Sequence, residues 1–87
     1  MENEKQGKVM KTGKLIEAIM QYRHIGIEEL AQKIDMAQPN LSNLIIGNRK
    51  ITVQLAKKIG DVLDIDPLVI MTNRMCEELR KENNNEL

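Results

Sequence analysis

Apolar residues recur along most of the chain with the 3.6-residue period of an amphipathic α-helix, and breaks in this period divide the chain into five segments. The segments predicted to be helical are residues 13–23, 27–34, 38–46, 53–63 and 67–82. Short connections containing Gly, Asp, Asn or Pro separate them, and these residues favour turns and helix ends. We therefore expect an all-α fold, a single domain over residues 12–82 whose fifth helix is the longest.

Several predicted helix ends carry residues suited to capping. Thr12, Thr52 and Asp66 each stand before an apolar-periodic segment, as N-cap residues do. Pro67 follows at the first helical position, where its missing N–H is harmless. Gly47 follows the third helix, at a position where a residue with positive φ is favoured.

The expected core is aliphatic, because the chain contains a single aromatic residue, Tyr22. Gly60 lies inside the fourth helix at a cost of about 1 kcal/mol relative to Ala, which indicates close packing against a neighbouring helix. Cys76, the single cysteine, lies near the apolar stripe of the fifth helix and is expected to be buried.

The apolar stripe of the fifth helix has two possible roles. It runs through Leu68, Met71, Met75 and Leu79. Either the stripe covers the underside of the core, or Met71, Met75 and Leu79 form a dimer interface.

The second and third segments have the arrangement of a helix-turn-helix, two short helices joined by a turn of about three residues. The second of these helices, residues 38–46, contains no Asp or Glu, and Gln38, Asn40 and Asn43 lie outside its apolar stripe. A carboxamide offers a donor and an acceptor side by side, which matches the N6/N7 edge of adenine in the major groove. A solvated helix face without such a role would normally carry Glu and Lys, so this face is predicted to contact bases.

The order and spacing of these residues resemble the lambda-repressor-like, XRE/Cro-type family of DNA-binding domains over roughly residues 15–68. The elements that match are Glu29-Leu30-Ala31, the turn at Met36, Leu41-Ser42, Gly47-Asn48-Arg49 and the helix after Thr52. The resemblance implies a five-helix fold and a transcriptional regulator, expected to be a repressor, that binds a double-stranded DNA operator. It also implies a homodimer on two half-sites about 34 Å apart.

The expected DNA contacts fall into two groups. Gln38, Pro39 and Asn43 are expected to contact bases, with Pro39 limited to apolar contact such as a thymine methyl group. The residues expected to contact phosphates are Asn40, Ser42, Asn48, Arg49 and Lys50.

Charge is unevenly distributed although the chain is neutral overall. Residues 36–60 contain four basic residues and no acid, whereas residues 61–87 contain seven acids and three bases. This distribution favours a basic surface in the middle of the chain that orients the domain on a polyanion, although charges can also cluster by chance in a short chain.

The remaining residue types point away from catalysis, cofactors and membranes. With one Cys and one His, the sequence shows no metal site and no catalytic constellation, so we expect neither an enzyme nor a cofactor. The chain has no apolar run near 18 residues and no signal peptide, so a soluble, cytoplasmic protein is expected. Residues 1–11 are expected to form a flexible arm and residues 83–87 a frayed tail.

Two alternative functions stay open at this point. Antitoxins of toxin–antitoxin pairs that resemble this family repress their own operon while binding a toxin, and the apolar Ile45 and Ile46 are candidates for such a contact. The zero net charge and Ile27, at a position where the family often has a polar phosphate-contacting residue, favour a different class, a helical protein-interaction module without DNA binding.

Overall fold

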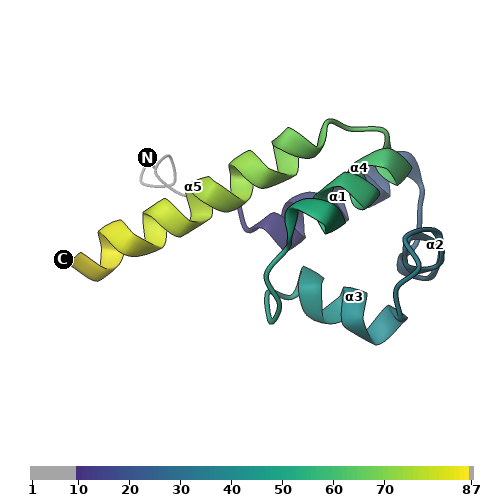
Figure 1. Ribbon diagram of the computed structural model, residues 1–87, viewed down its shortest axis with the longest axis horizontal. Helices are drawn as coiled ribbons and strands as arrows, with labels where there is room; N and C mark the ends of the chain where they lie inside the picture. Colours follow the sequence, from purple (N-terminus) through teal and green to yellow (C-terminus); the bar gives the residue numbers. More distant parts are fainter. Residues whose placement is uncertain (1–9, 87) are drawn as a thin grey trace.

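The computed structural model describes residues 10–86, and this part of the chain consists of five α-helices without a β-strand (Figure 1). The helices are α1 (Thr12–Arg23), α2 (Ile27–Lys33), α3 (Gln38–Ile45), α4 (Val53–Leu63) and α5 (Pro67–Glu86). The expected all-α fold with five helices is thereby confirmed. All but the last two residues of the predicted arm, 1–11, lie outside the described residues.

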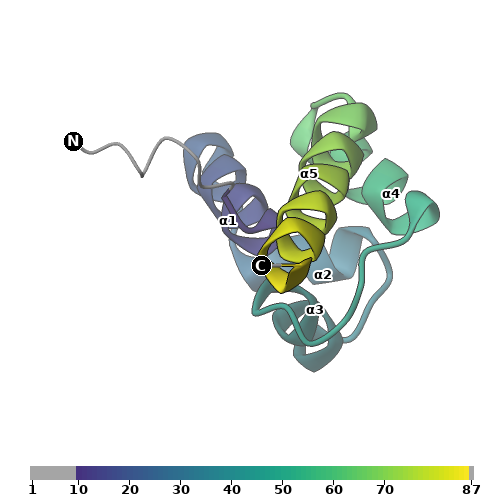
Figure 2. The ribbon, with the colours of Figure 1, turned by 90° about the vertical axis from the view of Figure 1, so that its left-hand side faces the viewer.

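One aliphatic core joins all five helices, because each helix contributes at least one side chain that is fully removed from solvent. These side chains are Ile16, Leu30, Leu41, Ile59, Leu63 and Ile70. Burial of a side chain of this size contributes about 1.5–3 kcal/mol, so this core ties each helix to the others. Figure 2 shows the bundle from one end: α5 lies between α1 and α4, and α3 lies at the bottom of the view.

Residues in the left-handed backbone conformation end several of the helices. His24, Asp35 and Asp64 have φ values near 60°, and Gly47 has a φ of 94°. Gly47 follows α3 as predicted, and the N–H groups of Gly47 and Asn48 donate to the carbonyl oxygens of Leu44 and Asn43, respectively. This pair of bonds satisfies carbonyl groups that the end of α3 would otherwise leave unpaired.

Two of the predicted N-caps are confirmed. The Thr52 hydroxyl accepts a hydrogen bond from the Leu55 N–H at 3.1 Å, at the start of α4. The Asp66 carboxylate accepts one from the Leu68 N–H at 3.0 Å, at the start of α5.

The prediction that Thr12 caps α1 is wrong. Lys11 occupies the N-cap position without a side-chain bond, and Thr12 is already helical and buried. Glu77 supplies the cap from α5: its Oε1 accepts hydrogen bonds from the Thr12 N–H at 3.0 Å and from the Thr12 hydroxyl at 2.7 Å. The capping group comes from a residue far away in sequence, so local patterns could not reveal it.

Glycine permits close approach at two points in the bundle. A Cβ atom added to Gly60 would lie 2.7 Å from the Ile65 carbonyl oxygen and 3.2 Å from Cγ of Pro67, which confirms the expected close packing at this position. A Cβ atom on Gly13 would lie 1.7 Å from the carbonyl oxygen of Ile45, so only glycine lets α1 pass this close to the end of α3.

The fifth helix is longer than predicted and projects beyond the other four (Figure 1). It continues to Glu86, so residues 83–86, predicted as part of a frayed tail, are helical. Asn disfavours a helix interior only mildly compared with Gly or Pro, so three successive Asn residues need not end a helix.

Only part of the apolar surface of α5 faces the core. Ile70 is fully buried and Met71 packs partly against the core, whereas Leu68, Met75 and Leu79 are 66 %, 59 % and 58 % exposed. The stripe through these three exposed residues therefore does not cover the core of its own chain. Cys76 is exposed as well, so the prediction that it is buried filler is wrong.

Candidate nucleic-acid interface

The third helix is anchored to the bundle along one side. Leu41 and Leu44 are buried, and Ile45 is partly buried against the core beside α1. The close approach at Gly13 fixes the distance between α1 and the last turn of α3. The position of α3 is therefore set by side chains spaced three and four residues apart, which leaves its opposite side free for another role.

The outward side of α3 carries the residues predicted to contact bases. Gln38, Pro39 and Asn43 are all exposed, as is Asn40, while Ser42 is half-buried. The three carboxamide side chains make no hydrogen bond to any residue that the structure describes. Their donors and acceptors are thus available to a partner.

Ile46 extends the same surface at the end of the helix and is 67 % exposed. It follows Ser42 and Asn43 by four and three residues, so it shares their side of α3. Of the two isoleucines before Gly47, Ile46 is the one exposed to solvent, and Ile45 is the one that packs inward.

The loop after α3 presents the predicted phosphate-contacting residues. Asn48, Arg49 and Lys50 are exposed, and Ile51, which follows them, is buried and holds the end of the loop against the core. The loop thus places two cations beside the C-terminal end of α3, within reach of the same partner.

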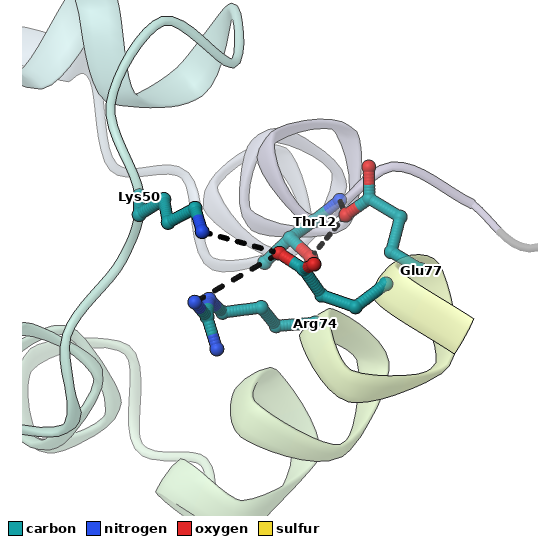
Figure 3. Close-up of polar contacts among 5 residues, drawn as sticks. Thr12, Lys50, Arg74 and Glu77 are labelled. Carbon is teal, nitrogen blue, oxygen red and sulfur yellow. Dashed lines mark hydrogen bonds and ion pairs between the residues drawn. The ribbon is translucent and has the colours of Figure 1, made fainter. Parts of the chain in front are cut away.

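The fifth helix contributes side chains next to this loop that the sequence analysis did not single out (Figure 3). Oε2 of Glu78 lies 3.9 Å from Nζ of Lys50 and 3.9 Å from Nη2 of Arg74. Asn73 donates through Nδ2 to the Met10 carbonyl oxygen and to the Thr12 hydroxyl. In the sequence, Arg74 and Glu78 look like an ordinary exposed i,i+4 pair, and only the packing of α5 brings them to the loop.

The described residues contain no other candidate chemistry. No group of three or more His, Cys, Asp or Glu side chains gathers among them in a way that would hold a metal ion. No helix in the described range is long and apolar enough to cross a membrane.

Comparison with known proteins identifies the same region. The family HTH_3, described as helix-turn-helix, matches residues 16–70, which run from α1 into α5 and include α2, α3 and the loop. No curated protein and no solved structure matches the chain.

Proposed function

Because the chain belongs to the helix-turn-helix family HTH_3, a family of DNA-binding regulators, we propose that it is a sequence-specific transcriptional repressor that reads the major groove with α3. The observation that carries the proposal is the outward side of α3, which combines exposed carboxamides with a complete lack of acids. The major groove of B-DNA is wide enough to admit an α-helix, and it displays a distinct pattern of donors and acceptors for each base pair. Bound there, the protein would block a promoter by occupying it.

Within this proposal the side chains of α3 and its loop have different tasks. Gln38 and Asn43 make bidentate hydrogen bonds to adenine, and Pro39 contacts a thymine methyl group. Five other residues position the domain on phosphates and do not read the base sequence. They are Asn40, Ser42, Asn48, Arg49 and Lys50.

We further propose that the protein binds its operator as a homodimer formed through the outward side of α5. Leu68, Met75 and Leu79 are each more than half exposed, and with Thr72 they have the 4-3-4 spacing of a two-helix seam. Met71, predicted as part of this interface, packs partly against the core and lies at the edge of the seam. A second copy fits such a surface, because a symmetric pair of domains can occupy two half-sites one helical turn apart.

The decisive experiment compares a base-contacting residue with a phosphate-contacting one. Duplexes that bind the protein are first selected from a random pool, and the affinities of Gln38→Ala and Arg49→Ala are then measured on the selected site and on single-base variants of it. Gln38→Ala should relax discrimination at one base pair, where a good bidentate contact contributes about 1–3 kcal/mol. Arg49→Ala should weaken binding to all sequences alike and flatten the salt dependence. The reverse pattern would remove the assignment of α3 as the reading helix.

The exposure of Ile46 supports a second candidate function, that of an antitoxin which also represses its own operon. An apolar side chain of this size at the surface can pack against a partner protein. A small basic protein encoded next to this chain's gene, and co-purification of the two, would favour the antitoxin. If the chain is instead a protein-interaction module without DNA binding, the wild-type protein will not change the electrophoretic mobility of any duplex at low salt.

A further inference from the structure

Glu78 pairs with two cations from distant parts of the chain, Lys50 and Arg74, whose side chains Figure 3 labels. Lys50 belongs to the loop after α3, and Arg74 belongs to α5, yet both lie 3.9 Å from the same carboxylate oxygen. The Lys50 and Arg74 nitrogens are therefore less than about 8 Å apart. A single oxyanion can contact both of them, as Glu78 does.

The surroundings of this carboxylate form one continuous surface with the end of α3. Lys11, Arg49, Lys50 and Arg74 line a single pocket together with Ile46 and Gly47. Glu77 and Glu78 line it too, but the Glu77 carboxylate is engaged at the N-terminus of α1, where the partial positive charge of the helix offsets it. The pocket therefore carries more positive than negative charge, and Glu78 is the acid that the two cations share.

We propose that Arg74 is a further phosphate-contacting residue, and that Glu78 is an internal counter-ion which a DNA phosphate replaces on Lys50 and Arg74. This inference rests on the proposed function, because it requires a duplex bound along α3 and its loop. A guanidinium fits a phosphate with two parallel hydrogen bonds, so Arg74 can exchange one oxyanion for the other without losing its partner. The exchange is favoured because ion pairs of this length at a surface are weak, and the Lys50, Glu78 and Arg74 side chains are 76 %, 41 % and 26 % exposed.

The test measures the affinity of the full chain for its selected duplex between about 50 and 200 mM salt, the range over which phosphate contacts are most visible. Arg74→Gln should lower the slope of log K against log salt by about 0.9, the value of one phosphate contact. Across this range of salt, the fold loss of affinity should therefore be about three times smaller for the variant than for the wild type. Arg74→Lys should keep most of the slope, because it keeps the charge. The control is Arg80→Gln, which removes an exposed arginine roughly 120° round the same helix from Arg74 and should leave the slope unchanged.

Glu78→Gln gives an independent measurement. Removing the internal counter-ion should tighten binding to all duplexes at low salt, and this gain should shrink when Arg74 is already Gln, because the two residues act on the same phosphate. Circular dichroism and thermal melting confirm that each variant is folded, and if Arg74→Gln does not fold, Arg74→Met, which also removes the charge but keeps an apolar stem, replaces it in both measurements.

Three different failures are distinguishable. If the wild type binds its duplex but Arg74→Gln behaves like Arg80→Gln throughout the salt series, the assignment of Arg74 is overturned while the proposed function stands. If Glu78→Gln leaves the affinity unchanged, the counter-ion role is overturned. If the wild type binds no duplex at low salt, the proposed function itself fails.

Discussion

Single residues set the fit between helices at two points near the N-terminus of α1. Gly13 lies against the Ile45 carbonyl group, where any side chain would collide with the backbone of α3. Glu77 reaches from α5 to the first turn of α1 and accepts two hydrogen bonds from Thr12. Both contacts tie α1 to elements that matter for the proposed interface, because one fixes α3 and the other fixes α5.

We expect Gly13→Ala to lower the free energy of unfolding by about 2 kcal/mol or more, because the new methyl group meets backbone atoms that cannot move aside as a flexible side chain would. Urea denaturation measures this loss. The matched control is Gly26→Ala, which adds the same methyl group where nothing lies within 4 Å. Gly26 is the N-cap of α2, where Ala is less favourable, so the cost should not exceed about 1 kcal/mol. Equal losses in the two variants would show that the approach of α1 to α3 is not tight.

We expect Glu77→Gln to lower the free energy of unfolding by about 1 kcal/mol, since a neutral amide is a weaker acceptor at a helix N-terminus than a carboxylate. Glu17→Gln is the comparison, because Glu17 also lies on a helix but, among the described residues, pairs only with Lys14 on the surface. Its effect should stay within about 0.5 kcal/mol. Urea denaturation measures the free energy of unfolding of both variants. A Glu77→Gln unfolding curve that coincides with the wild-type curve would argue against the cap.

At the scale of elements, α5 presents two different faces. Its inward face buries Ile70 and brings Arg74, Glu77 and Glu78 to α1 and the loop. Its outward face carries an apolar seam that the described residues leave exposed, and such surfaces often mark interaction sites. A helix with partners on one face and an uncovered seam on the other is suited to joining two copies of the domain.

We expect Met75→Glu and Leu79→Glu each to weaken self-association by at least tenfold, because like charges from both copies would meet in the seam. Sedimentation velocity over a range of concentrations measures the change, and circular dichroism should show an unchanged helix content. Val53→Glu serves as control, since Val53 is equally exposed but belongs to α4. A wild-type protein that stays monomeric at high concentration would contradict the dimer.

At the scale of the whole molecule, the position of charge matters more than its sum. The chain is neutral, yet residues 36–60 contain no acid, and this range includes α3, the loop and most of α4. A neutral protein can still be oriented on a polyanion if its charges are separated in space, because phosphate contacts are local.

This idea predicts that two variants with the same change in net charge will behave differently. Replacing Arg49 and Lys50 by Gln should weaken duplex binding at least tenfold, because two phosphate contacts are lost. Replacing Lys57 and Lys58 by Gln removes the same charge from α4, where Lys57 pairs with Asp61, and should change the affinity less than threefold. Mobility-shift titrations at one fixed salt concentration compare them. Equal losses would mean that binding follows net charge and not the site.

The sequence by itself determined the five helices, the helix-turn-helix and most of the helix ends, because periodicity, N-caps and Gly47 act within a few residues of one another. It also indicated the outward residues of α3, since Leu41 and Leu44 mark the buried side and the carboxamides necessarily lie elsewhere. The caps at Thr52 and Asp66 were predictable for the same reason: donor and acceptor are two or three residues apart.

Only the tertiary structure decided what α5 touches. The helix carries apolar residues on both sides, Ile70 on one and Leu68, Met75 and Leu79 on the other, so its periodicity alone left open which side packs inward. Glu77 caps α1 from the other end of the chain. Glu78 pairs with Lys50 of the loop as well as with Arg74 of its own helix, and Lys50 is far from both along the chain. Such contacts depend on how whole helices dock against one another, and no local pattern of residue types encodes that docking.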